Sequence, residues 1–187
     1  MKGKWVLLSL AMLVLLSLLS GCRISFTAAK ENQPHKPQNI MMDASVSFKP
    51  HQIIIRGDTD LPQGSVLYIM LKPYDETVSL EEIQTYQVEP EDIALASTAK
   101  VGKEGSIELT VLKWPDPNKR YRLDLMFIPD NQPEDIKLGE NLITNEDYIE
   151  ISENGKTLTG LLLYVNVLKE DEVIGGTMDF IPKHSTP

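Results

Sequence analysis

The residue whose position most restricts its chemistry is Cys22, the only cysteine of the 187-residue chain. It lies shortly after an apolar run near the N-terminus. One thiol cannot form a disulfide within the chain, and zinc or iron–sulfur sites need several soft ligands close together. The usual structural roles of a cysteine are therefore excluded, and a role for Cys22 has to come from the segment that precedes it.

Carboxylates in two loops are the candidates for a metal site. Asp58 and Asp60 lie two residues apart in GDTDLPQG, and PDNQPED offers further oxygen ligands at 130–135. Calcium takes six to eight oxygens, and neither loop has the ligand spacing of an EF-hand. We interpret these carboxylates as solvated turn residues and expect no cofactor. Asp58 and Asp60 are the candidate ligands in the alternative that calcium binds.

Histidine is the other residue type that could support catalysis. His35 lies near the N-terminus, His184 lies at the C-terminus, and His51 follows Pro50 at the start of a β-rich run. A serine-histidine-aspartate triad would have to use His51, and no Gly-x-Ser-x-Gly turn supplies the serine. Neither a His-Glu-x-x-His run nor a phosphate-binding loop is present. The sequence therefore predicts no catalytic residue and a protein that is not an enzyme.

The segment before the cysteine has the layout of a secretory signal. Lys2 and Lys4 precede an apolar run at 5–19, and the small residues Ser20 and Gly21 follow it. The run is shorter than the roughly twenty residues that a helix needs to cross a bilayer. We therefore expect a cleaved leader rather than a permanent spanning helix.

Leu19-Ser20-Gly21-Cys22 resembles the lipobox of bacterial lipoproteins. The resemblance implies that a diacylglyceryl group is attached to the Cys22 thiol, and that cleavage between Gly21 and Cys22 makes the cysteine the new N-terminus. Two acyl chains are sufficient for stable membrane anchoring. A plain secretory signal and an uncleaved anchor helix are the alternatives.

The chain is acidic, with a formal net charge of −9 that becomes −11 when Lys2 and Lys4 leave with the signal. An acidic domain is not attracted to anionic headgroups or to nucleic acid phosphates. We therefore expect no nucleic-acid partner, and attachment to the membrane only through the lipid on Cys22.

The expected organisation is a signal peptide (1–21), a lipidated N-terminus with a flexible tether (22–43), one domain (44–183) and a tail (184–187). The tether is rich in proline, amides and charged residues and has little apolar periodicity. The remaining residues are enough for one ordinary hydrophobic core but not for two.

Short β-strands follow one another from residue 44 onward. YRLDLMF has the clearest alternation. Its odd positions, from Tyr121 to Phe127, are apolar and are predicted to face the core, whereas Arg122, Asp124 and Met126 are predicted to face water.

Turn signals connect several of these strands. SIELTVL is predicted to form a hairpin with IALASTAKV through 102–105, with Ile107, Leu109 and Val111 on its buried face. Asn154-Gly155 predicts a second hairpin, between YIEIS and KTLTGLLLYVNVL. The latter run is apolar on both faces, which indicates a central strand.

The expected fold is a mainly β, immunoglobulin-like antiparallel sandwich with short helical decorations. Strands at this spacing favour a sandwich, and Ser79 and Glu82 have capping-box spacing at the start of a short helix, SLEEIQTYQ. LKWPDPNKRYRLDLMF resembles the tyrosine corner of fibronectin type III and related immunoglobulin-like domains, with Leu112, Pro115 and Tyr121 at the matching positions. The turn is longer than usual in those domains, and the cysteine pair of antibody domains is missing.

From these features we expect a lipid-anchored, extracytoplasmic binding or structural module of the bacterial cell envelope, with an envelope protein or a glycan as its partner. Because this fold hosts many functions, the expectation depends on the anchor and on the missing catalytic residue types. Two alternatives remain open. One is a calcium- or carboxylate-dependent envelope factor or enzyme, and the other is a sandwich that inhibits proteases.

Overall fold

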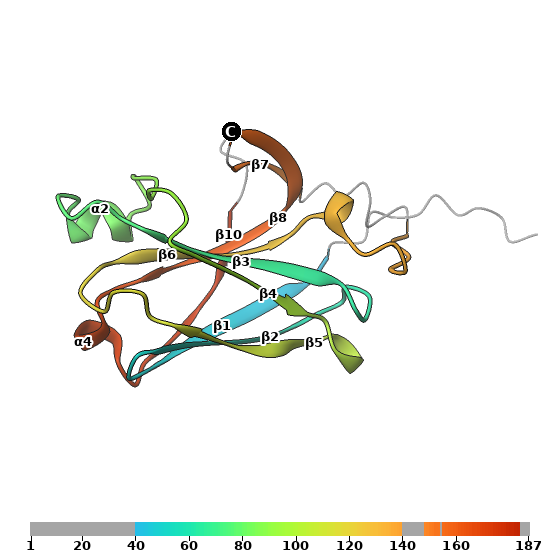
Figure 1. The fold of residues 1–187 in the computed structure, drawn as a ribbon, viewed down its shortest axis with the longest axis horizontal. Helices are drawn as coiled ribbons and strands as arrows, with labels where there is room; N and C mark the ends of the chain where they lie inside the picture. Colours follow the sequence, from blue (N-terminus) through green and yellow to red (C-terminus); the bar gives the residue numbers. More distant parts are fainter. Residues whose placement is uncertain (1–39, 140–147, 154, 184–187) are drawn as a thin grey trace, which may run out of the picture. The chain divides into compact units, whose positions relative to one another are not determined.

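The computed structural model describes residues 40–139, 148–153 and 155–183, all of which belong to one compact unit of the chain (36–187). Short strands dominate this part of the chain (Figure 1). In order, the elements are β1 (Met42–Lys49), β2 (Gln52–Thr59), β3 (Val66–Pro73), α2 (Leu80–Gln84), β4 (Leu95–Lys100), η1 (Lys103–Gly105), β5 (Ser106–Lys113), β6 (Tyr121–Phe127), η2 (Pro129–Asn131), β7 (Ile149–Glu153), β8 (Lys156–Val167), α4 (Glu170–Val173), β9 (Thr177–Asp179) and β10 (Ile181–Pro182).

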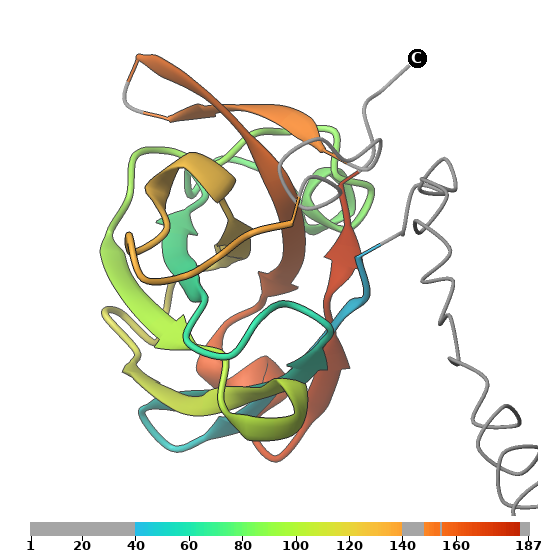
Figure 2. The ribbon, with the colours of Figure 1, turned by 90° about the vertical axis from the view of Figure 1, so that its right-hand side faces the viewer.

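Two antiparallel sheets pack face to face as a β-sandwich (Figures 1 and 2). Sheet A has the order β5-β2-β1-β9, and sheet B has the order β10-β8-β6-β3-β4, with β7 paired to the start of β8. A bridge between Val101 and Ile107 links the sheets on one side, and Phe180 carries the chain from β9 to β10 on the other. The prediction of a mainly β protein with antiparallel sheets is confirmed.

The hydrophobic core lies between the sheets and is built mainly from alternate residues of the longer strands. Phe48 and Ile55 from sheet A, and Leu67, Leu125 and Val165 from sheet B, are all almost completely buried. Each such side chain contributes about 1.5 to 3 kcal/mol when it leaves water. This core holds both sheets in place, and with them the outer face of sheet B.

β6 lies in the middle of sheet B, between β3 and β8, and all seven of its residues are buried. The prediction for its odd positions is confirmed, because they point into the core. The prediction that Arg122, Asp124 and Met126 face water is wrong. The β7–β8 hairpin and the connection between β3 and β4 cover their face of the sheet, and both come from distant parts of the sequence.

β5 is a strand as predicted, but its alternation is broken. Between Ile55 and Gly57 of β2 the register slips, which is the mark of a β-bulge in β5. Ile107 remains buried, but beyond the bulge the faces exchange, so that Leu109 and Val111 are 59% and 50% exposed. The prediction that these two side chains face the core is therefore wrong.

The predicted hairpin between β4 and β5 does not form. β4 pairs with β3 in sheet B, and β5 pairs with β2 in sheet A, so the chain crosses between the sheets at η1. A Cβ on Gly105 would lie 2.1 Å from the carbonyl oxygen of Thr59, which shows how tightly this corner packs against β2. The glycines predicted the turn correctly but did not indicate which strands pair.

The second predicted hairpin is confirmed, because β7 and β8 pair from Glu153–Lys156 to Ile149–Gly160. Gly155 has a φ of 72°, a conformation that glycine adopts readily and that type I′ hairpin turns require. The prediction that the last apolar run is a central strand is also confirmed, since β8 lies between β6 and β10. β8 is the longest of the described strands, with 12 residues, and only its second part belongs to the sheet proper (Figure 2).

The Tyr121 ring is buried at the start of β6, and its hydroxyl turns back to the preceding connection. The hydroxyl donates to the carbonyl oxygen of Asp116 at 3.1 Å and accepts from the amide of the same residue at 3.0 Å. The connection from β5 to β6 is thereby fixed to the strand that it leads into.

Candidate functional site

Three rows of side chains cross the outer face of sheet B, from β3 through β6 to β8. The strand register sets these rows. From the polar end to the apolar end of the face they are Lys72–Arg122–Asn166, Met70–Asp124–Tyr164 and Tyr68–Met126–Leu162.

The β7–β8 hairpin covers the apolar end of this face. Ile149 and Ile151 of β7 pack with Met126 and Leu162 in a second hydrophobic cluster, separate from the core between the sheets. The cluster explains why β8 is apolar on both faces. It also holds β7 above the sheet rather than beside it.

The connection between β3 and β4 covers the polar end. α2 begins at a capping box formed by Ser79 and Glu82, as predicted, and its Ile83 is buried. Asn166 fixes the connection, because its side-chain amide donates to the carbonyl oxygen of Ile83 at 2.6 Å and accepts from the Tyr74 hydroxyl at 2.8 Å. Burial raises the pKa of Tyr74, so this hydroxyl remains a hydrogen-bond donor at neutral pH.

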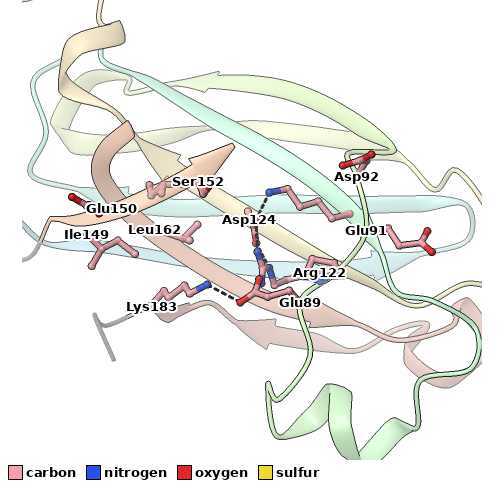
Figure 3. A pocket seen from close by; sticks show the side chains of 13 residues that line it. Glu89, Glu91, Asp92, Arg122, Asp124, Ile149, Glu150, Ser152, Leu162 and Lys183 are labelled. Atoms are coloured by element: carbon pink, nitrogen blue, oxygen red, sulfur yellow. Dashed lines mark hydrogen bonds and ion pairs between the residues drawn. The ribbon is translucent and has the colours of Figure 1, made fainter. Parts of the chain in front are cut away.

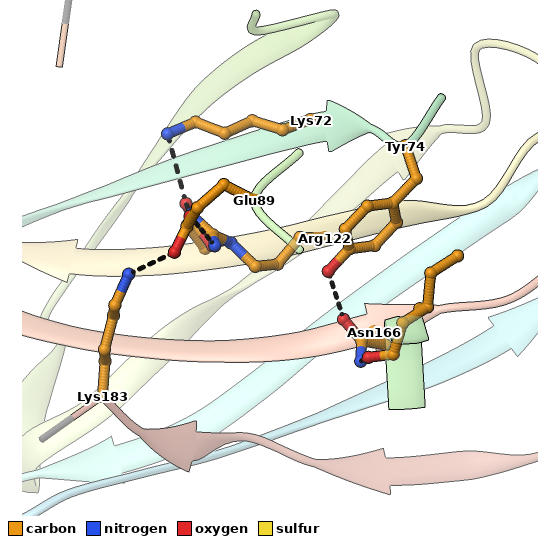
Figure 4. Close-up of polar contacts among 8 residues, drawn as sticks. Lys72, Tyr74, Glu89, Arg122, Asn166 and Lys183 are labelled. Carbon is orange, nitrogen blue, oxygen red and sulfur yellow. Dashed lines mark hydrogen bonds and ion pairs between the residues drawn. The ribbon is translucent and has the colours of Figure 1, made fainter. Parts of the chain in front are cut away.

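Five charged side chains alternate in sign between these two covers, in what we call the charge chain (Figure 4). Asp124 lies 3.3 Å from the Lys72 ammonium, and it accepts two hydrogen bonds from the Arg122 guanidinium, at 2.7 and 3.1 Å. Arg122 also donates to Glu89 at 2.5 Å, and Glu89 accepts from Lys183 at 3.0 Å.

The first three members of the charge chain are nearly sealed from water: Asp124 is 1% exposed, Arg122 7% and Lys72 8%. Burial alone would lower the pKa of Arg122, but the carboxylates of Asp124 and Glu89 outweigh it, and the pKa is raised. The guanidinium also lies over the ring of Tyr164, 5.7 Å from its centroid, where a cation–π attraction adds to the ion pairs. Arg122 is therefore held firmly in its charged form.

A cavity of about 810 Å³ opens above the charge chain, between β7 and the segment that holds Glu89 to Asp92 (Figure 3). We call it the outer-face pocket. It is lined by Lys72, Glu89, Pro90, Glu91, Asp92, Arg122, Asp124, Ile149, Glu150, Ile151, Ser152, Leu162 and Lys183. Its size is that of a typical ligand site, and its lining combines apolar side chains with eight charged ones.

A contribution to stability does not by itself explain why these ions are buried. Removing two cations and a carboxylate from water costs several kcal/mol per ion, and well-packed apolar residues of similar volume are usually as stable or more stable. Groups of this kind, placed at the floor of an open pocket, are therefore candidates for function. The outer-face pocket can hold a ligand by apolar contact, hydrogen bonding and ion pairing.

The exposed member of the charge chain, Glu89, should make stability depend on pH. Burial opposes its charged form, but hydrogen bonds from Arg122 and Lys183 prevail and lower the pKa of its carboxyl. A lowered pKa contributes stability above the unfolded-state pKa of about 4.5, and this stability is lost as pH falls through the folded-state value.

We predict that wild type is more stable than Glu89→Gln by about 0.5 kcal/mol or less at pH 7, because the carboxylate is 68% exposed and screened by solvent. Urea unfolding of both proteins from pH 7 to pH 2.5 measures this difference. The difference in the free energy of unfolding should vanish near pH 2.5. A difference that grows as the pH falls would contradict a lowered pKa for Glu89.

Tyr86 is a strained residue at the edge of the site. It follows the C-cap of α2 with a φ of 54°, and the amides of Tyr86 and Gln87 bond back to Ile83 and Glu82, which is the Schellman pattern that usually has glycine at this position. Its ring meets Tyr164 edge to face at 4.8 Å.

We predict that Tyr86→Ala lowers the free energy of unfolding by about 1 kcal/mol, because the aromatic contact is lost and the strain stays. Tyr86→Gly loses the same contact but also removes about 1 kcal/mol of left-handed strain, so it should remain close to wild type. Equal stability of the two variants in urea unfolding would show that the backbone at Tyr86 is unstrained.

The sites predicted from the sequence lie away from this pocket or outside the described residues. Gly21 and Cys22 fall outside them. Asp58 is the next-to-last residue of β2 and Asp60 follows that strand, and both are exposed. Within the described ranges no three His, Cys, Asp or Glu side chains gather as metal ligands. His51 lies in the β1–β2 turn, where its amide and ring contact Glu170.

Sequence reasoning missed the outer-face pocket because it assigned Arg122 and Asp124 to a wet surface. One signal was available in the sequence. The segments that became the neighbouring strands β3 and β8 have apolar residues on both faces, and a central strand between such neighbours has little contact with water on either face. Lys183 and Glu89 gave no signal, since both lie in connecting or terminal segments and reach the site only through the tertiary fold.

Comparisons with protein-family models, with curated proteins and with solved structures each gave no match. In the described part of the chain no helix is long and apolar enough to cross a membrane.

Proposed function

We propose that this protein is a lipid-anchored, extracytoplasmic binding module of the bacterial cell envelope, and that its ligand binds in the outer-face pocket. The observation that carries the binding proposal is the buried, ion-paired trio Lys72–Asp124–Arg122 at the floor of an open pocket. The lipobox-like Leu19 to Cys22 supports the anchor.

An immunoglobulin-like topology is part of this proposal. In such domains the second strand lies between the first and the fifth, and the sixth strand lies between the third and the last. Supporting this, β1 and β5 flank β2, and β3 and β8 flank β6. The hydroxyl of Tyr121 bonds to the backbone at Asp116, as in a tyrosine corner.

The anchor is tested by expressing the full chain and its Cys22→Ser variant in a bacterial host. Wild type should lose residues 1–21 and partition into the membrane fraction. It should gain the mass of a diacylglyceryl group, either with an additional acyl chain on the new N-terminal amine or with that amine free. The variant should lack the lipid mass. A wild-type protein that is cleaved without lipid and released into the medium would overturn the anchor.

The pocket is tested by photo-crosslinking in the same cells. A photoreactive phenylalanine analogue replaces Glu150, which lines the pocket, or Glu108, which is equally exposed on β5 of the other sheet. We expect a discrete adduct at position 150 that is missing at position 108. The same adducts at both positions, or none at position 150, would reject the pocket as the binding site.

A further inference from the structure

We propose that the ligand of the outer-face pocket is an extended, basic polypeptide segment that adds to the free edge of β7 as a further strand. This inference depends on the proposed function, since it names the chemical class of ligand for the same pocket. Three features of the described residues carry it: the edge of β7, the charge balance of the pocket and its apolar wall.

β7 meets the pocket along its edge. Ile149, Glu150, Ile151 and Ser152 all line the cavity. Consecutive residues of a strand point to opposite faces, so a cavity that touches all four must run along the strand. In the described part of the chain β7 pairs with β8 alone, and the edge along the pocket is therefore the one that β8 leaves open.

The hairpin register assigns the backbone groups on this free edge. Glu153 and Lys156 close a two-residue turn, and such a closing pair is hydrogen-bonded. Because bonded and non-bonded pairs alternate, Ile151 and Ile149 also bond to β8. The N–H and C=O groups of Glu150 and Ser152 then point toward the pocket, where an extended chain can bond to them as in β-augmentation.

The charge balance of the pocket favours a basic ligand. Its lining has three cations and five carboxylates, which leaves an excess of two negative charges. Each cation already contacts a carboxylate of the charge chain, so an anionic ligand finds no cation without a partner. The exposed Glu91, Asp92 and Glu150 form no ion pair within the described ranges. Glu150 lies on one side of the pocket, and Glu91 and Asp92 lie on the other (Figure 3).

The apolar wall completes the match to a strand. Ile149, Ile151 and Leu162 line the same cavity as the rim carboxylates. A strand that alternates basic and apolar residues presents one kind of side chain to the wall and the other to the rim. A segment such as Lys-Val-Lys-Val-Lys-Val has this pattern, and the size of the pocket is that of sites that hold ligands of comparable length.

The test measures binding of this hexapeptide, blocked at both ends and labelled with a fluorophore, to the full chain in neutral detergent. We expect binding that weakens with added salt, and at least about tenfold weaker binding of the Glu-Val counterpart. A triple variant, Glu91→Gln with Asp92→Asn and Glu150→Gln, should bind the basic peptide at least about tenfold more weakly. The matched control is Glu108→Gln with Glu134→Gln and Asp58→Asn, which changes the net charge equally at exposed positions outside the pocket and should bind like wild type.

The strand geometry is tested with peptides methylated on alternate backbone amides. One of the two methylation patterns removes the donors that face β7 and should reduce binding by about tenfold, whereas the other pattern should not. Ser152→Pro removes a donor from the free edge of β7 but none from its ladder with β8, and should weaken binding of the unmethylated peptide in an otherwise folded protein.

Equal binding of the acidic and basic peptides, or equal binding of both methylated peptides, would overturn the inference. So would the absence of any basic-peptide binding by wild type. If any of these results is obtained but a cross-link still forms at position 150 in cells, the proposed function stands and the ligand is of another class. If no cross-link forms at position 150 either, both the inference and the proposed binding site are rejected.

Discussion

Replacing Asp124 by asparagine is expected to lower the free energy of unfolding by about 3 to 5 kcal/mol. The carboxylate is 1% exposed and is shared by the Lys72 ammonium and the Arg122 guanidinium. Asparagine has nearly the same shape but no charge, so both cations keep their places without a compensating charge in the interior. A buried ion whose partner is removed costs far more than the intact pair contributes.

Urea unfolding at pH 7 measures the loss, with Asp58→Asn as the matched control. Asp58 is exposed, and its replacement should change stability by less than about 0.5 kcal/mol. A third protein, in which Lys72→Met, Arg122→Met and Asp124→Leu are combined, should be about as stable as wild type, because the ions are removed together. A loss below about 1 kcal/mol in Asp124→Asn would mean that water reaches the trio.

The combined variant also separates stability from function. If the trio is kept for binding, the triple variant should fold well and yet fail to cross-link at position 150. A variant that folds and still cross-links would show that the ions serve neither role.

Gly160→Ala should be strongly disruptive, with an expected loss of about 2 to 3 kcal/mol. Gly160 lies where β8 leaves its pairing with β7 and begins its pairing with β6. An added Cβ would lie 2.2 Å from the carbonyl oxygen of Phe127 and 3.3 Å from the Cα of Ile128. These neighbours are backbone atoms of β6 and its exit, so they cannot move aside as a flexible side chain does.

The control is Gly139→Ala, because a Cβ at Gly139 meets no atom within 4 Å. Its effect should lie between no change and a gain of about 1 kcal/mol from the less flexible unfolded chain. Hydrogen exchange adds a local measurement, since the amides of β7 should exchange faster in Gly160→Ala if the hairpin is displaced from the sheet. Equal stability of the two variants would show that β8 can shift at Gly160 without cost.

The two predictions concern two parts of the same site, its floor and the hairpin that covers it. Asp124 anchors the floor of the outer-face pocket, and Gly160 allows the β7–β8 hairpin to pass close above it. The pocket therefore depends on one buried charge and one missing side chain, neither of which is conspicuous in the sequence.

The sequence by itself determined the local elements. Alternation identified β6 and the face that enters the core, Asn154-Gly155 identified the β7–β8 hairpin, and Ser79 with Glu82 identified the start of α2. These features depend on residues that are near neighbours in the chain, whose periodicity and turn conformations are set by backbone geometry.

The tertiary structure alone decided what covers the second face of each strand and which strands pair across the sheets. A period of two shows that one face of β6 is apolar, but it cannot show that Ile149, Ile83 and Glu89 come to lie over the other. The bulge that exposes Leu109, and the crossing from β4 to β5, likewise depend on partners distant in sequence. Burial is a property of the surroundings of a residue, and for the outer face of sheet B those surroundings are assembled only when the chain has folded.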